Sequence, residues 1–288
     1  MKIHLSSADL QVGIYTKGAE VFSVQNNEGL EFMWQANPLY WPRHAPVLFP
    51  IVGRLKDNIY FIDQKKYTLP QHGFARDAFF EPVLMSASSC TFQLKAQDSM
   101  ADQYPFDFVF EITHRVEGNT LHTQYTVINP SSQTLHFSVG AHPAFNWPIE
   151  PSEKAEDYYL AFEDSSYTLS LLQDGLRSGH TKPLNLQGRQ LPLHHALFDQ
   201  DALVFEHSQI QAVSLCSSKS KRRVEMRCDN WPYFGIWSKK GPAPFICLEP
   251  WYGIADSVKS TQQLTEKQGL IALPGFDRFE CAMSVRFV

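Results

Sequence analysis

The 288-residue sequence lacks a dense run of either charge, and only 19% of its residues are charged. Its 25 basic and 30 acidic residues give a net charge of -5. The densest basic cluster, at residues 219–223, is interrupted by Ser220 and is too short to neutralise a run of phosphates. We therefore interpret it as a solvated turn before a strand, and we expect no nucleic-acid partner.

Long apolar runs are also missing. No stretch approaches the roughly 20 residues that a membrane-spanning helix needs. The first six residues alternate as in a strand and do not form the apolar core of a signal peptide. The sequence therefore predicts a cytoplasmic protein without a membrane partner.

Cysteine is scarce and scattered, which disfavours both a disulfide framework and a structural zinc site. The five cysteines contain no C-x-x-C pair: Cys90, Cys216, Cys228, Cys247 and Cys281. The histidine patterns typical of metal enzymes, H-x-H and H-E-x-x-H, are absent as well, and the adjacent His194 and His195 cannot easily direct both rings at one metal. We therefore expect buried thiols and no metal.

Helical patterning is limited to a turn or two at residues 99–104, and the glycine-rich phosphate-binding motifs are absent. A doubly wound nucleotide-binding fold, which needs helices of about 10 to 15 residues, is therefore improbable. What the sequence does contain is apolar and aromatic material, with 43% hydrophobic residues that include 21 Phe, 11 Tyr and 6 Trp. This is enough for a large core.

Alternating patterns predict β-structure along most of the chain. Residues 108–113 and 121–127 alternate on either side of a turn around Gly118 and predict a hairpin. Further strands are expected at residues 11–16, 20–25, 60–69, 90–96, 134–141, 202–206, 212–216 and 233–237. Proline-rich stretches at residues 37–50, 141–151 and 239–250 predict loops, and residues 163–200 predict long irregular loops. The sequence thus predicts an all-β protein, a large antiparallel β-sandwich with few short helices, in one domain spanning residues 1–288.

Residues 46–77 combine glycine, proline and aromatic residues with four polar side chains suited to a pocket: Arg54, Gln71, His72 and Arg76. From residue types alone, the two arginines are equally consistent with surface ion pairs to Asp57 and Asp77.

Two further residues are candidates for proton transfer. His142 lies where an alternating strand stops at Pro143, next to glycine and aromatic residues. Glu249 ends an apolar strand and precedes Pro-Trp-Tyr, where partial desolvation would raise its pKa and make it a suitable general base. The alternatives are a structural histidine and a glutamate at the rim of the sheet.

Four segments, in order along nearly the whole chain, resemble the aldose 1-epimerase family of galactose mutarotase-like proteins: Gly53-Arg54, Gln71-His72-Gly73-Phe74-Ala75-Arg76, His142-Pro143-Ala144-Phe145-Asn146 and Leu248-Glu249-Pro250-Trp251. The resemblance implies a large β-sandwich with an open sugar-binding cleft and with neither a metal nor an organic cofactor. It also implies an isomerase that interconverts the α and β anomers of an aldohexose.

By this resemblance, His142 is the general acid that protonates the ring oxygen, and Glu249 is the base that removes the proton of the C1 hydroxyl. The resemblance also implies that a set of side chains binds the sugar: Arg54, Gln71, His72, Arg76, Asp201 and Trp251. Asp199 is close enough in sequence to be the ligand-binding aspartate instead of Asp201.

The sequence departs from the best-known galactose mutarotases where Lys56-Asp57-Asn58-Ile59 replaces their usual N-R-I segment. The segment Q-H-G-F-A-R is instead similar to the branch that acts on hexose 6-phosphates. The partner is therefore a small sugar or a sugar phosphate, and the protein is a monomer or a homodimer. A catalytically inactive carbohydrate-binding protein remains the alternative, as does a glycoside hydrolase that pairs Glu249 with Asp201 or Asp256.

Overall fold

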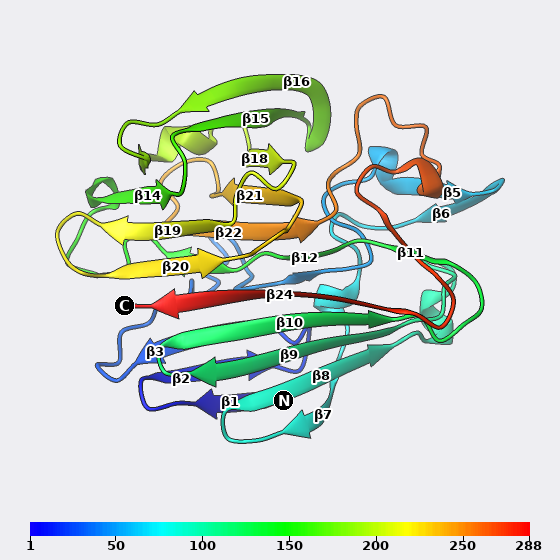
Figure 1. Ribbon diagram of the computed structural model, residues 1–288, viewed down its shortest axis with the longest axis horizontal. Helices are drawn as coiled ribbons and strands as arrows, with labels where there is room; N and C mark the ends of the chain where they lie inside the picture. The colour runs from blue at the N-terminus through cyan, green and yellow to red at the C-terminus, as the bar shows by residue number, and fades with distance from the viewer.

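The computed structural model describes all of residues 1–288 and contains β-strands, loops and short 3-10 helices but no α-helix (Figure 1). The expected all-β antiparallel sandwich is thereby confirmed. No helix has the length and apolar character needed to cross a bilayer.

Two large sheets make up most of the molecule, and three small sheets complete it. The first large sheet has nine strands in the order β17 (Gln190–Pro192), β14 (Tyr158–Phe162), β19 (Ala212–Ser217), β20 (Arg223–Arg227), β24 (Arg278–Phe287), β10 (Thr120–Ile128), β9 (Val109–Glu117), β8 (Ser89–Lys95) and β7 (Glu81–Met85). The second is ordered β16 (Leu176–Asn185), β15 (Ser166–Gln173), β18 (Leu203–Glu206), β21 (Tyr233–Trp237), β22 (Phe245–Tyr252), β12 (Val139–Ala141) and β4 (Val47–Leu48), and β13 (Ala144–Asn146) also pairs with β22.

The small sheets lie around these two. They comprise β1 (Lys2–Ser6), β2 (Leu10–Tyr15) and β3 (Val21–Asn26); β5 (Ile59–Ile62) and β6 (Lys65–Thr68); and β11 (Leu135–Phe137) and β23 (Ile271–Leu273). The 3-10 helices are η1 (Lys56–Asn58), η2 (Ala75–Asp77), η3 (Asp98–Met100), η4 (Ala155–Asp157), η5 (His195–Phe198) and η6 (Leu264–Glu266).

The predicted hairpin becomes β9 and β10, which are joined by a turn at Gly118 and Asn119. Phe110 and Ile112 of its alternating face are at most 1% exposed, because every second residue faces the second sheet. The Phe110 ring stacks on Phe49, which follows β4 in the other sheet, with a centroid distance of 4.4 Å. A continuous cluster of 63 buried apolar residues links the two sheets in this way.

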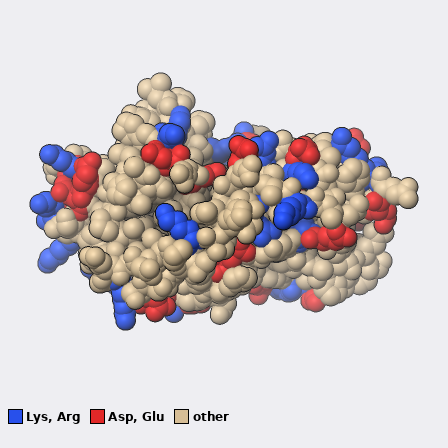
Figure 2. Space-filling view, turned by 90° about the horizontal axis from the view of Figure 1, so that it is seen from above, with Lys and Arg blue, Asp and Glu red and all other residues tan.

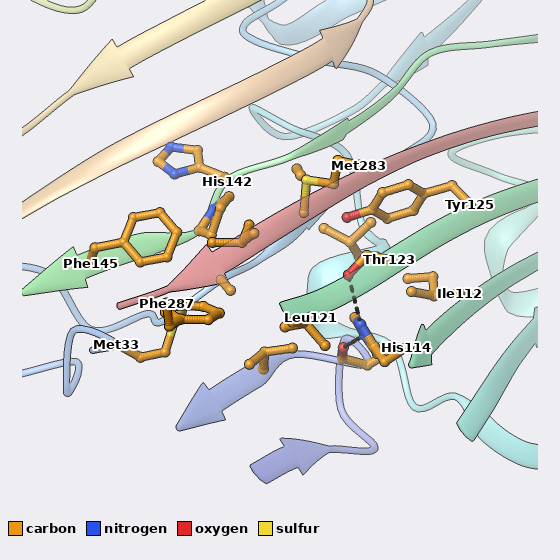
Figure 3. A pocket seen from close by; sticks show the side chains of 17 residues that line it. Met33, Ile112, His114, Leu121, Thr123, Tyr125, His142, Phe145, Met283 and Phe287 are labelled. Carbon is orange, nitrogen blue, oxygen red and sulfur yellow. Dashed lines mark hydrogen bonds between the residues drawn. The ribbon is translucent and has the colours of Figure 1, made fainter. Parts of the chain in front are cut away.

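A small cavity of about 30 Å³ lies between the sheets (Figure 3). On one side of it, His114 is buried; its Nε2 lies 3.0 Å from the carbonyl oxygen of Ala19, and its Nδ1 lies 3.0 Å from the Thr123 hydroxyl. Since a carbonyl only accepts, Nε2 carries the proton and Nδ1 accepts from Thr123. Burial lowers the pKa of His114 to about 4, so the ring is neutral and structural. His142 lines the same cavity.

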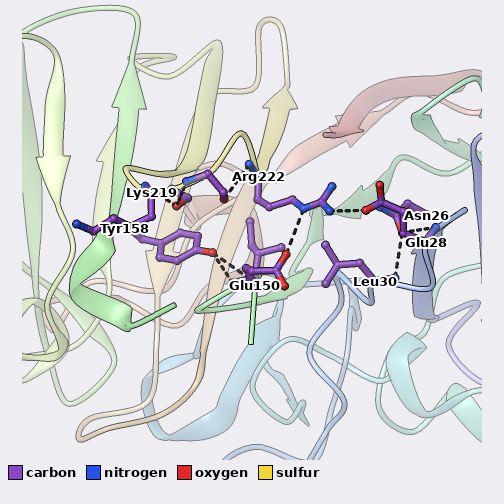
Figure 4. A network of polar contacts seen from close by, with 10 residues as sticks. Asn26, Glu28, Leu30, Glu150, Tyr158, Lys219 and Arg222 are labelled. Carbon is purple, nitrogen blue, oxygen red and sulfur yellow. Dashed lines mark hydrogen bonds and ion pairs between the residues drawn. The ribbon is translucent and has the colours of Figure 1, made fainter. Parts of the chain in front are cut away.

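Arg222, which precedes β20, connects the first large sheet to the N-terminal sheet (Figure 4). Its Nε lies 3.3 Å from Oε2 of Glu150, and its Nη2 contacts Glu28 after β3. Such partly exposed ion pairs contribute only about 0–1 kcal/mol to stability. Arg222 therefore mainly fixes the position of the N-terminal sheet relative to the first large sheet. Elsewhere, Lys and Arg are interspersed with Asp and Glu on the face that Figure 2 shows.

Several expectations about local structure were wrong. Residues 163–200 contain the β15–β16 hairpin and β17 and are not long loops, and residues 60–69 and 134–141 each form two strands and not one. The loops expected at residues 37–50, 141–151 and 239–250 contain β4, β13 and most of β22. The edge strand β16 has no buried residue and shows no alternation, whereas β15 buries Tyr167 and Leu169 between exposed residues, a short alternation that was overlooked. In residues 60–69 the turn forms at Asp63, which has a positive φ of 53°.

Candidate active site

A cavity of about 320 Å³ opens beside β22 in the second large sheet. Its walls combine three indole rings with six polar side chains: Trp41, Trp237 and Trp251, and Gln71, His72, Arg76, His142, Asp201 and Glu249. The mixture of aromatic faces and convergent polar groups is typical of a small-molecule site.

Glu249 lies within β22, and the expectation that it ends the strand was wrong. The strand continues through Pro250 to Tyr252 because Pro250 costs no ladder hydrogen bond. Leu248 donates its N–H to the carbonyl of Pro143, so the nitrogen of Pro250, two residues on, points to the same side. At that point the neighbouring chain is interrupted between β12 and β13, so the sheet loses no hydrogen bond through the missing N–H of Pro250.

His142 occupies that interruption. Because β12 and β13 both pair with β22, the residues between them are held against the strand that carries Glu249. The Nε2 atom of His142 lies 3.1 Å from Oε2 of Glu249. The two residues are only 7% and 2% exposed. The structure thus brings together the two side chains that the sequence singled out for proton transfer.

Burial disfavours a charge on either member of this pair. Burial, with a smaller contribution from repulsion by Arg76 and Arg43, lowers the pKa of His142 to about 3. Burial also raises the pKa of Glu249 well above its usual value; the Trp251 side chain acts against this rise, and Asp201 adds to it. Near neutral pH the pair therefore carries no net charge. It holds one proton more than a carboxylate and a neutral imidazole would, and the two groups share this proton across 3.1 Å.

His72 is held as a neutral donor next to this pair. Its Nδ1 accepts a hydrogen bond of 3.1 Å from the backbone N–H of Gly53, so the proton of the neutral ring is on Nε2. Burial, together with His142 and two arginines, lowers its pKa well below the usual value. Its Nε2 lies 3.3 Å from the amide nitrogen of Gln71, which is itself a donor, so these two atoms make no hydrogen bond with each other. Its ring centroid lies 5.5 Å from that of His142.

Two tryptophans around His142 were missed by the sequence analysis. Trp41 stacks on the imidazole with a centroid distance of 4.9 Å and an interplanar angle of 26°, and Trp237 meets it edge-on at 5.8 Å. Trp41 belongs to an irregular proline-rich stretch, where periodicity gives no signal, and Trp237 ends a strand that could equally have turned it into the core. Only the tertiary fold shows that both rings face the cavity.

Trp251 forms another wall of the cavity because glycines lie beneath its ring. Gly140 of β12 and Gly235 of β21 belong to the strands on either side of β22. A Cβ atom would lie 2.8 Å from the ring at Gly140 and 2.3 Å at Gly235. Any larger residue at these two positions would therefore displace the indole.

The two arginines have different positions. Arg76 lines the cavity, where its Nη2 donates a hydrogen bond of 2.6 Å to the backbone carbonyl of Gln71. Arg54 is not among the lining residues, and its Nη1 donates to the carbonyl of Asp174 at 3.2 Å. Of the two aspartates, Asp201 lines the cavity, whereas Asp199 is exposed and does not.

The residues with metal-binding capacity in this region are His142, Cys247 and Glu249. One ligand atom from each lies within 4.8 Å of the others, and all three residues are buried. Cys247 carries a free thiol and was expected from the sequence only to be buried.

Comparison with known proteins gives consistent matches. The sequence profile of a family described as aldose 1-epimerase matches residues 1–269. The plasmid-encoded protein LacX of Lactococcus lactis subsp. lactis is 33% identical over 277 residues, which is 93% of each chain. The crystal structure of a galactose mutarotase related enzyme from Lactobacillus acidophilus superposes with a TM-score of 0.95 and 36% identity, covering 100% of this chain and 97% of that one. A galactose mutarotase-like protein from Lactobacillus casei has a TM-score of 0.92 and 29% identity, with both chains fully covered.

Proposed function

Because the chain belongs to the aldose 1-epimerase family, we propose that it interconverts the α and β anomers of an aldohexose. We assign His142 as the general acid and Glu249 as the general base. The observation that carries this proposal is the buried contact of 3.1 Å between the two side chains at a cavity of about 320 Å³. Anomer exchange requires one group that protonates O5 and one that deprotonates the C1 hydroxyl, and because both oxygens are bonded to C1, neighbouring groups can reach them.

In the proposed reaction the sugar takes part in the proton exchange of the pair. His142 gives its proton to the ring oxygen O5 while Glu249 takes the proton of the C1 hydroxyl, the C1–O5 bond breaks, and an aldehyde forms at C1. Rotation about C1–C2 presents the other face, and the reverse transfers close the ring. The pair thus alternates between two tautomers with the same total number of protons, and the site never gains a net charge.

The remaining lining residues are suited to orient a sugar. His72 offers its Nε2–H, Arg76 and Gln71 offer further donors, and Asp201 offers acceptors. The apolar wall formed by Trp251 provides an aromatic face for the C–H groups of a hexose ring.

The placement of the arginines favours a neutral hexose over a hexose 6-phosphate. A bidentate phosphate clamp from Arg54 and Arg76 would need both guanidinium groups at the cavity. Only Arg76 lines it, since Arg54 is held by the carbonyl of Asp174. A catalytically inactive binding protein is also disfavoured, since both proton-transfer residues are present and in contact.

The proposal is tested by following anomer exchange with NMR for glucose, galactose and glucose 6-phosphate. We expect His142→Asn and Glu249→Gln to lower kcat by about 10²- to 10⁴-fold while the protein stays folded, because each removes one proton-transfer group. His180→Asn and Glu117→Gln, which change exposed residues of the same types outside the cavity, serve as controls. Exchange at the wild-type rate in both active-site variants would disprove the assigned roles, and exchange of none of the sugars would disprove the activity.

A further inference from the structure

We propose that His142, Cys247 and Glu249 form a binding site for a thiophilic divalent cation such as Zn²⁺, and that an ion bound there blocks the active site. The three side chains supply one nitrogen, one sulfur and one oxygen ligand, and these atoms lie within 4.8 Å of one another. The binding of the ion does not depend on the proposed function, whereas the inhibition does.

The strand geometry explains why the three groups converge. Cys247 and Glu249 are two residues apart in β22, so their side chains lie on the same face of the sheet. Ala144 of β13 is paired with Cys247, and His142 precedes it by two residues. The imidazole therefore approaches the same face from the adjacent chain.

The distances suit a tetrahedral ion with little rearrangement. Two ligands at about 2.0–2.1 Å from a tetrahedral zinc lie roughly 3.3 Å apart. The observed separation of 3.1 Å between Nε2 of His142 and Oε2 of Glu249 is within a few tenths of an ångström of this value. Sulfur is a longer ligand, at about 2.3 Å from zinc, which allows the Cys247 Sγ to lie further away.

Charge and access also agree with a bound cation. A thiolate and a carboxylate together neutralise a divalent ion, so a bound site carries no net charge in a buried environment. Arg76 in the same cavity acts against a cation, and Asp201 on its wall acts in favour. His142 and Glu249 both line the cavity, so an ion can reach them from solvent, and Cys247, which is not among the lining residues, is within 4.8 Å of both.

An ion in this position would occupy the lone pair of His142 and the carboxylate of Glu249. Both groups would then be unable to exchange protons with a sugar. We therefore expect inhibition that a chelator reverses and that a saturating sugar prevents.

Titration of the metal-free protein with Co²⁺ tests the site directly, because thiolate coordination produces a ligand-to-metal charge-transfer absorption. We expect this absorption at one equivalent in the wild type and its loss in Cys247→Ala, with Zn²⁺ affinity by calorimetry falling roughly tenfold or more. Cys247→Ser preserves the volume of the side chain in case Cys247→Ala is unstable. Cys90→Ala is the matched control, since Cys90 is equally buried but lies in the other sheet.

Anomer exchange in the presence of Zn²⁺ provides the second measurement. The wild type and Cys90→Ala should be inhibited, and the Cys247 variants should not. Absence of the charge-transfer absorption, or Zn²⁺ binding of equal strength in the Cys247 variants, would overturn the proposal. The Co²⁺ titration is informative even if the protein exchanges no sugar anomers, so the failure of this site is distinguishable from the failure of the proposed function.

Discussion

The proton that His142 and Glu249 share is held where water cannot stabilise a charge on either group. The carboxyl pKa is raised and the imidazole pKa is lowered, so the tautomer with a neutral imidazole and a protonated carboxyl is favoured in the free protein. This is also the tautomer that ring opening of the sugar would leave behind. Before the ring opens, the shared proton must therefore pass from Glu249 to His142 across their 3.1 Å contact, and ring opening then returns the pair to the tautomer that burial favours.

These shifts predict the pH dependence of kcat/KM. The pair loses its base when it gains a second proton, which requires a pH near the lowered pKa of His142, about 3. The pair loses its acid when the shared proton dissociates, and burial of Glu249 moves this dissociation to higher pH. We therefore expect a constant kcat/KM across neutral pH, measured by NMR at each pH at which the protein remains folded. Loss of activity on acidification through pH 6.5, the ordinary histidine value, would contradict this explanation.

At the scale of the strand, the site depends on the surroundings of β22. Glycines on both neighbouring strands make room for the Trp251 ring, and a break in one neighbour holds His142 and accommodates Pro250. The same strand therefore supplies the base, an aromatic wall and the backbone to which the segment with the acid is paired.

Gly235→Ala should disturb this arrangement. Its Cβ would lie 2.3 Å from the Trp251 ring, and we expect an unfolding free energy lower by about 1–3 kcal/mol together with a several-fold increase in KM for the sugar. Gly13→Ala is the control, because its Cβ would meet the Phe22 ring at 2.5 Å in the N-terminal sheet, away from the cavity. That variant should lose stability but keep its KM. An unchanged KM in Gly235→Ala would show that Trp251 does not contact the sugar.

Elements with one buried face were predictable from the sequence. The β9–β10 hairpin alternates clearly, because one side packs against the core and the other does not. In the β15–β16 hairpin, the edge strand β16 has no buried residue and gives no periodic signal, and only the short alternation around Tyr167 and Leu169 in β15 could have indicated it. In the candidate site, His142 and Glu249 have distinctive neighbours in sequence. Trp41 was missed because its contact with His142 joins segments about a hundred residues apart, for which local pattern has no signal.

At the scale of the whole molecule, the last strand joins two halves of a sheet. β24 pairs with β10 over nine residues and with β20 over four, and so lies between the strands β7–β10 on one side and β20, β19, β14 and β17 on the other. Figure 1 shows this strand in red across the middle of the molecule. The family profile ends at residue 269, before β24 begins, but the sheet is incomplete without this strand.

Removing residues 278–288 should therefore abolish folding. Both β10 and β20 would lose one of their two partners, so the sheet would be divided, and Val285 and Phe287 would leave the buried core. We expect no cooperative transition in thermal unfolding monitored by circular dichroism. Leu84→Ser is the control, since this residue is 70% exposed on the edge strand of the same sheet and its change should leave the transition in place. A truncated chain that unfolds cooperatively would disprove this role for β24.

Three of the six tryptophans, Trp41, Trp237 and Trp251, line one cavity, and the three others are buried elsewhere. Half of the tryptophans are therefore in a position to contact a bound ligand, so intrinsic tryptophan fluorescence should report binding at this site. Sugar added to the wild type should change the intensity or the wavelength of the intrinsic emission in a saturable way, and Trp251→Phe should reduce the change. An emission that is unaffected by a sugar whose anomers the protein exchanges would place that sugar away from these rings.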